Sequence, residues 1–269
     1  MEVRGIRRRM KYKTLQFDCE QAAATITLNR PEKRNTISAE MITELLLAFD
    51  AAEASPARVV ILTGAGKAFC AGMDLEELRA HEGQSLQENL EDARRMAKLF
   101  LGIYRFPKPV IAAVNGAALA GGCGLATLAD FTLAAPEVKF GYTEVRIGFL
   151  PALVSIFLRR QIGEKRARDL LLSGRILDAA EALRLGLVTE VVPAGNLMAC
   201  AREVAGILAA ASLEAVARTK RLLVESEEAA LQAEIELAIR ASAEIRSTAN
   251  FREGLSSFLE KRPPKWKRD

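Results

Sequence analysis

The sequence predicts an α/β protein built around a parallel sheet. Its first half alternates short apolar segments with longer segments of helical spacing, and this order of strand, helix and strand is typical of parallel sheets. The 269 residues are enough for one large core, and half of them are hydrophobic. No stretch rich in proline, glycine or serine divides the sequence, so we expect one continuous fold.

Four segments of the first half are predicted strands. Residues 58–64 (RVVILTG) and 109–116 (PVIAAVNG) are continuous apolar runs, which is typical of parallel strands buried on both faces. Residues 24–28 and 130–135 are the other two.

Helices are predicted between and after these strands. Residues 38–54 have helical apolar spacing with Ser38 as N-cap, and residues 86–106 form a second helix that ends before Pro107. The sequence is mostly helical after about residue 153. There we expect helices at 212–229, 231–247 and 249–262, and one short strand at 187–193.

Composition excludes several classes of function. The four cysteines are far apart and form no C-x-x-C pair, which indicates a reduced cytoplasmic protein without structural disulfides or zinc. The single histidine, His81, lies in a polar stretch, so a Ser-His-Asp triad or a histidine-rich metal site is not expected. No apolar run reaches the roughly 18 residues of a membrane helix, and no apolar segment of a secretory signal follows the basic start. The basic residues at both ends are interpreted as solvated tails, with attraction to nucleic acid or to a phosphate-bearing ligand as the alternative.

Two glycine-bearing turns are candidates for binding an oxyanion. In 63–78 (TGAGKAFCAGMDLEEL), Ala68 and Ile61 exclude a P-loop, and Asp74 is expected to cap a short helix beside free N–H groups near Met73. In 118–130 (ALAGGCGLATLAD), glycines lead into a second helix. The glycine cluster alone fits a tight helix–sheet contact equally well, but two such helix starts together favour an oxyanion hole.

A carboxyl group is predicted near these turns. Glu144 follows Gly141 and precedes an apolar run. Partial burial would raise the pKa of Glu144 toward a range that suits proton transfer, whereas Glu137 has the sequence context of a solvated turn residue.

These segments resemble the crotonase family, also called the enoyl-CoA hydratase/isomerase family. The resemblance rests on LNRPEKRNTIS (28–38), GKAFCAGMDLEEL (66–78), PVIAAVNGAALAGGCGLATLAD (109–130) and FGYTEVRIGFLP (140–151), and it continues through 163–193 and 251–264. It implies a crotonase-like spiral of β-β-α turns over residues 11–195 and a helical trimerisation region over 196–269. Residues 1–10 would then be a disordered extension, and the trimers would remain single or pair into hexamers.

The resemblance also implies the roles of individual residues. The substrate would be an acyl-CoA, with no metal and no cofactor apart from the CoA of the substrate itself. The N–H groups of Met73 and Gly121 would bind the thioester oxygen, and Glu144 would be the acid/base group. Substrate-binding residues would be Arg34, near a CoA phosphate, and Lys261, near the nucleotide end of a neighbour's CoA, together with Ala71, Asp74, Leu75 and Gly122.

The chain departs from the hydratases of the family at Gly124, where they carry a first glutamate. Hydration uses two carboxylates most simply, whereas moving a double bond from the 3- to the 2-position needs only one. We therefore expect an enoyl-CoA isomerase, with an enoyl-CoA hydratase as the alternative and an RNA-binding or non-catalytic member as a third hypothesis. A glutamate at position 124 should raise hydration relative to isomerisation. Bulky residues at 150–154 (LPALV) should also reshape the acyl pocket.

Overall fold

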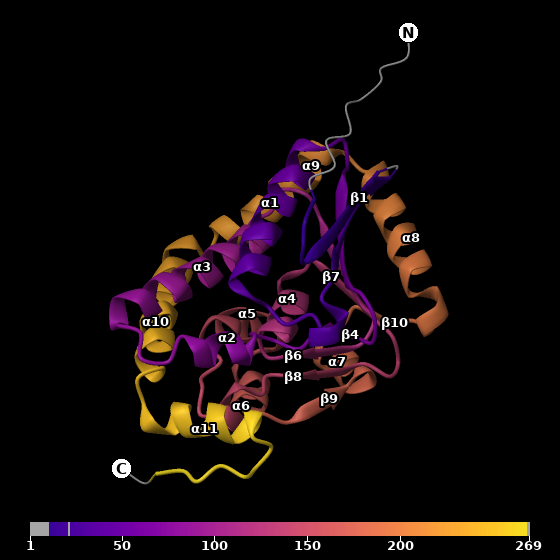
Figure 1. Ribbon diagram of the computed structural model, residues 1–269. Helices are drawn as coiled ribbons and strands as arrows, with labels where there is room; N and C mark the ends of the chain where they lie inside the picture. Colours follow the sequence, from indigo (N-terminus) through magenta and orange to yellow (C-terminus); the bar gives the residue numbers. More distant parts are fainter. Residues whose placement is uncertain (1–10, 21, 268–269) are drawn as a thin grey trace.

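The computed structural model describes residues 11–20 and 22–267 of the chain (Figure 1). The extension expected at residues 1–10 lies outside these residues. None of the helices that they form combines the length and the apolar composition needed to cross a bilayer.

The larger of two sheets contains the strands that the sequence predicted. Its strand order is β1-β2-β3-β5-β7-β10, in which β1 is antiparallel to β2 and the other neighbours are parallel. The bounds are Leu15–Glu20 (β1), Ala23–Leu28 (β2), Val59–Gly64 (β3), Val110–Val114 (β5), Phe131–Ala134 (β7) and Glu190–Val191 (β10). Sequence analysis did not predict β1, and β10 is shorter than expected.

A second sheet of short strands was not predicted. It contains β4 (Ala68–Cys70), β6 (Ala117–Leu119), β8 (Lys139–Gly141) and β9 (Ile176–Asp178), in that spatial order. Each pair β3–β4, β5–β6 and β7–β8 places one strand in each sheet and is followed by helical structure. This repetition is the β-β-α spiral that the resemblance implied.

Eleven α-helices complete the part of the chain that the structure describes. They are α1 (Ala39–Ala54), α2 (Leu75–Ala80), α3 (Leu86–Tyr104), α4 (Gly121–Leu128), α5 (Ala152–Ile162), α6 (Glu164–Ser173), α7 (Ala179–Leu185), α8 (Leu197–Ala210), α9 (Leu213–Glu225), α10 (Glu228–Ile245) and α11 (Ala249–Leu259). Ser38 caps α1 as predicted, because its side chain accepts a hydrogen bond from the Met41 N–H. Short 3-10 helices lie at Pro31–Lys33 (η1), Glu144–Ile147 (η2) and Ala194–Asn196 (η3).

The larger sheet is buried on both faces. Val60 and Leu62 of β3 belong to the main core, whereas Val59 and Ile61 of the same strand pack with α8 on the other face. Successive side chains of a strand point to opposite faces, so a strand covered on both sides is apolar throughout. Burial on both faces therefore explains the continuous apolar run of β3.

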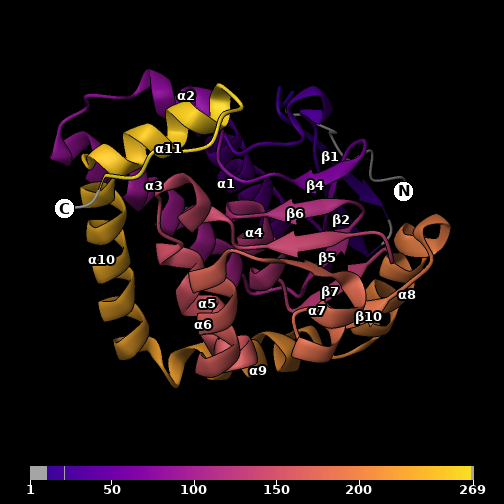
Figure 2. The ribbon, with the colours of Figure 1, turned by 90° about the horizontal axis from the view of Figure 1, so that it is seen from below.

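The C-terminal helices α10 and α11 pack against the β-β-α spiral of the same chain. Helix α10 packs against α3 and α5, and α11 packs against α2 and η2 (Figure 2). The expected boundary after residue 195 lies just before α8, which covers the larger sheet. The trimer or hexamer expected from the resemblance stays a prediction.

Candidate active site

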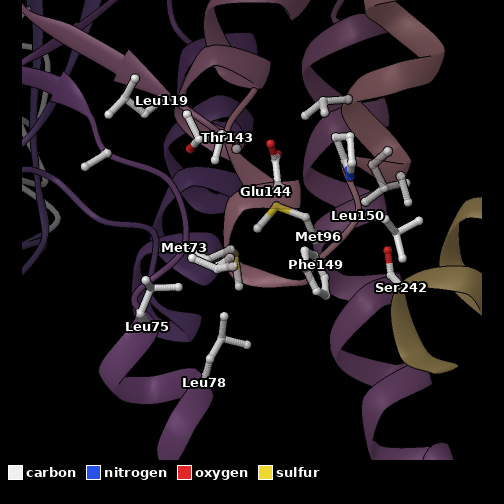
Figure 3. Close-up of a pocket in the computed structure, with 18 of the residues that line it drawn as sticks. Met73, Leu75, Leu78, Met96, Leu119, Thr143, Glu144, Phe149, Leu150 and Ser242 are labelled. Carbon is white, nitrogen blue, oxygen red and sulfur yellow. The ribbon is translucent and has the colours of Figure 1, made fainter. Parts of the chain in front are cut away.

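One cavity is lined by segments from both ends of the chain. Its walls come from Arg34, the 71–78 segment, α3, the β6–α4 junction, η2, the start of α5, α10 and α11, and its volume is about 210 Å³. Figure 3 shows Glu144 between Leu119 and Met73 on one side and Ser242 on the other. Residues 150–154 all line it, so the bulky LPALV segment does shape this space.

Glu144 presents a buried carboxyl group to the cavity. It is the first residue of η2, directly after β8, and only 7% of its surface is exposed. Its Oε2 atom is buried without a hydrogen-bond partner among the described residues. Burial raises the pKa of Glu144 to about 7, against the opposing effect of its own backbone N–H. No other acidic side chain from the described residues lines the cavity.

Two backbone N–H groups of the segments that the sequence singled out have no backbone partner among the described residues. Loop residue Ile37 pairs with the 72–74 segment, since its N–H donates to Gly72 O (2.8 Å) and its carbonyl accepts from the Asp74 N–H (3.0 Å). This pairing leaves the Met73 N–H without a backbone partner in the described chain, and the Gly121 N–H at the start of α4 has none either. A Cβ atom on Gly72 would lie 3.5 Å from Gly121 N, so the two segments are adjacent.

Packing requires a glycine at position 122 but not at position 121. A Cβ atom on Gly122 would lie 2.1 Å from Cys70 O, so Gly122 is required for the close contact between α4 and β4. A Cβ atom on Gly121 would meet only Ile37 Cδ1, at the ordinary distance of 3.5 Å. Packing therefore explains Gly122 and does not require glycine at position 121.

Gly124 does not line the cavity, and the expectation that a glutamate there would reach the substrate stays a prediction that the packing around position 124 opposes. A Cβ atom on Gly124 would lie 2.5 Å from Val154 Cγ1 and 2.9 Å from Phe100 Cζ. These two side chains line the cavity, and Gly124 is buried behind them. The space that a side chain at position 124 would need is already filled.

The loop that carries Arg34 is held in place by a buried amide. Asn35 is fully buried, and its Nδ2 donates to Ala65 O (2.9 Å) and Ala68 O (2.8 Å). The carbonyl of Arg34 in turn accepts a hydrogen bond from the Ala71 N–H (3.0 Å). The sequence analysis did not single out Asn35, because its role depends on carbonyl groups about 30 residues away in the sequence.

The other residues predicted to bind substrate divide into two groups. Arg34, Ala71 and Leu75 line the cavity. Gly122 and Lys261 do not, and Lys261 is exposed just beyond α11.

Asp74 also lies outside the cavity lining. Its carboxylate caps α2, accepts from the Glu76 and Glu77 N–H groups, and pairs with Arg30 at 2.9 Å. Burial opposes ionisation, but the hydrogen bonds from Arg30 and the Glu77 N–H hold the pKa of Asp74 below its usual value. The expected capping role is confirmed.

Sequence analysis missed the contribution of the C-terminal helices to this cavity. Ser242 and Arg246 of α10 and Phe258 of α11 line it. Ser242 and Arg246 continue the helical face that carries the buried residues Ile235 and Ile239. Polar residues on a buried face are a signal that the sequence contains. The described residues include no cluster of three side chains suited to hold a metal ion.

Comparisons with known proteins agree with this geometry. The family model for enoyl-CoA hydratase/isomerase matches residues 18–269. A relative from Thermus thermophilus, described by its name as an enoyl-CoA hydratase, is 44% identical over 90% of this chain and 96% of its own. A Rhodobacter capsulatus relative with the same description is 39% identical over 95% of this chain and 98% of its own. The crystal structure of an enoyl-CoA hydratase/isomerase from Xanthobacter autotrophicus is 30% identical, with a TM-score of 0.86 over 93% of this chain and 97% of that one.

Proposed function

This chain belongs to the enoyl-CoA hydratase/isomerase family, whose members act on CoA thioesters, and from that premise we propose that it isomerises an enoyl-CoA with Glu144 as its single acid/base group. The double bond would move from the 3- to the 2-position of the acyl chain. The observation that carries the proposal is the buried carboxyl of Glu144, the one acidic group that the described residues bring to this cavity, which is also lined by Met73 and Gly121, whose N–H groups have no backbone partner among those residues.

The two N–H groups would stabilise the intermediate. With the thioester oxygen between the N–H groups of Met73 and Gly121, negative charge that develops on this oxygen meets two donors and the positive end of α4. Glu144 takes the proton from Cα, which gives a dienolate. The same carboxyl then returns the proton to Cγ, so no water is consumed and no second acid is needed.

The pKa of Glu144 suits this exchange. A group that must first accept and then donate a proton works best when its pKa is close to the working pH. Burial of Glu144 raises its pKa to about 7, which supports both steps near neutrality.

The filled space in front of Gly124 favours isomerisation over hydration. Hydration requires an activated water on one carbon and a proton on the other, which two carboxylates provide most simply. Val154 and Phe100 occupy the volume that a second carboxylate at position 124 would need. An enoyl-CoA hydratase is the second candidate, and the descriptions of the two bacterial relatives favour it.

An isotope experiment tests the proposed reaction. Wild type is incubated in ¹⁸O-water with a 3-enoyl-CoA and, separately, with crotonyl-CoA. The isobaric 2- and 3-enoyl thioesters are separated by chromatography, and every product is then weighed by mass spectrometry. We expect an unlabelled 2-enoyl product from the first substrate and no labelled hydroxyacyl product from either. Glu144→Gln should lower the isomerisation rate by roughly 10²–10⁴-fold, the usual contribution of one acid/base group.

The control for this variant is Glu137→Gln, which removes an exposed acid from the same β7–η2 region. It should turn over at the wild-type rate. A hydroxyacyl product that carries the label would show that the enzyme hydrates its substrate and would overturn the proposed isomerisation. A Glu144→Gln rate within a few-fold of wild type would overturn the role of Glu144.

A further inference from the structure

The cavity wall that α10 contributes carries two polar side chains, and one of them, Ser242, lies across Glu144 from Met73 (Figure 3). Ser242 and Arg246 both line it from α10, one helical turn apart. In Figure 3 the Ser242 hydroxyl points from α10 toward Leu150. The Arg246 side chain is 90% buried, with only 10% of its surface exposed. A cationic group therefore forms part of the wall that α10 contributes to the pocket.

The charge of Arg246 is only partly compensated. Its Nη1 lies 3.3 Å from Asp92 Oδ2, but Asp92 also pairs with Arg95, and His81 Nδ1 is 3.8 Å from the same Asp92 oxygen. One carboxylate is thus shared by two guanidinium groups. The Arg246 Nε is buried and has no hydrogen-bond partner among the described residues.

A purely aliphatic acyl chain is a poor match for this wall. A guanidinium keeps its proton in proteins, and a buried charge is costly unless it is paired and hydrogen-bonded. Hydrocarbon beside Arg246 would exclude water without offering an acceptor. A carboxylate would offer two acceptor oxygens to the planar guanidinium, and the Ser242 hydroxyl could donate to the same group.

We propose that Arg246 and Ser242 bind a carboxylate at the far end of the acyl chain, so that the substrate is the CoA monothioester of an unsaturated dicarboxylic acid. The inference rests on the proposed function, because it assumes that the thioester lies at the Met73 and Gly121 N–H groups. It goes beyond that function by assigning the chemical class of the acyl group.

Binding of unreactive thioesters tests this inference separately from the reaction. Adipoyl-CoA and suberoyl-CoA carry the terminal carboxylate, and hexanoyl-CoA and octanoyl-CoA are their matched controls without it. Because all four are saturated, they undergo neither isomerisation nor hydration. We expect calorimetry to show that wild type prefers at least one dicarboxylic member over its match by roughly 10- to 100-fold, the usual effect of a hydrogen bond to a charged group.

Four variants assign that preference to the proposed residues. Arg246→Met should abolish the preference and leave hexanoyl-CoA affinity within a few-fold, and Ser242→Ala should reduce it. Arg94→Met, which removes an exposed arginine of α3 outside the cavity lining, should keep it. Asp92→Asn retains Arg246 and removes the carboxylate that competes for it, so this variant should increase the preference. It keeps the proposal testable if Arg246→Met does not fold.

The outcomes separate the two proposals. Equal affinities within both matched pairs in wild type, or a preference that survives Arg246→Met, would overturn the carboxylate site while isomerase activity could still be present. A carboxylate preference in a protein that neither isomerises nor hydrates enoyl-CoA would support the site and overturn the proposed reaction.

Discussion

The properties of Glu144 come from its surroundings. Its type and position in the chain were visible in the sequence, but a glutamate between apolar residues is more often exposed than buried. In the fold only 7% of the surface of Glu144 is exposed, and its Oε2 atom has no hydrogen-bond partner within the described part of the chain. The cost of burying the charged form is what raises the pKa of this carboxyl group.

This raised pKa predicts a pH-dependent stability difference between wild type and Glu144→Gln. A folded-state pKa of about 7, above the ordinary value of 4.5, means that wild type loses stability as the pH rises through 7. Glutamine does not ionise, so the variant lacks this loss of stability. The free energy of unfolding of Glu144→Gln minus that of wild type should therefore be about 2 kcal/mol larger at pH 8 than at pH 5. Urea denaturation at the two pH values measures this difference.

Glu137→Gln is the control for this measurement, because Glu137 is exposed. A change with pH for Glu144→Gln that is no larger than the change for Glu137→Gln would contradict the raised pKa of Glu144.

At the scale of elements, α4 differs from α2 and α3, which also contribute residues to the cavity lining. Asp74 and Ser85 cap α2 and α3 with side-chain oxygens, whereas the N-cap of α4 is Ala120, whose side chain makes no hydrogen bond. The first N–H groups of α4 are therefore free for a ligand. Ala120 also has a φ of 48° and a ψ of −125°, a conformation that costs residues other than glycine about 1–3 kcal/mol.

Ala120→Gly should therefore stabilise the protein. Glycine adopts this backbone conformation without strain, and the gain should exceed the extra entropy of glycine in the unfolded chain, for a net increase of about 1 kcal/mol in the free energy of unfolding. Thermal or chemical denaturation measures it. Ala118→Gly, two residues earlier in β6, removes a buried methyl group from an extended backbone and should destabilise instead. If both variants lose stability equally, Ala120 is not strained.

At the scale of the whole molecule, three helices meet at Gly124. It lies on α4, and the side chains that its Cβ atom would contact belong to α3 and α5. Side chains of α3 and α5 therefore fill the space that a glutamate at this position would occupy. One substitution cannot restore a second carboxylate unless that bulk is removed.

Gly124→Glu alone should destabilise the protein and leave hydration unchanged. Overpacking of this kind costs about 1–3 kcal/mol, and the new carboxyl group would lie behind Val154 and Phe100. Combination with Val154→Gly and Phe100→Leu should recover part of the stability and raise hydration relative to isomerisation. The melting temperature and the ¹⁸O content of the product measure both effects, with the Val154→Gly, Phe100→Leu pair as control. A stable single variant that hydrates would show that position 124 reaches the substrate.

By itself the sequence determined the α/β class and the segments that carry Met73, Gly121 and Glu144, and its resemblance to the crotonase family implied the β-β-α spiral. The class and the segments follow from local signals, namely the apolar runs of β3 and β5, the caps at Ser38 and Asp74, and the glycine-bearing turns. The strands β4, β6, β8 and β9 have only three residues each, too few for a periodic pattern, and they exist because each pairs with distant neighbours.

Only the tertiary structure decided what surrounds the reactive groups. It paired the Asp74 carboxylate with Arg30, placed Gly124 behind two bulky side chains, and brought Ser242 and Arg246 from α10 to a cavity that is also lined by Arg34 and by residues of the segments 71–78 and 143–154. Burial, steric fit and charge compensation all depend on which residues become neighbours when the chain closes. The physical reason is that these effects act through space, over a few ångströms, between residues whose separation along the chain carries no record of their contact.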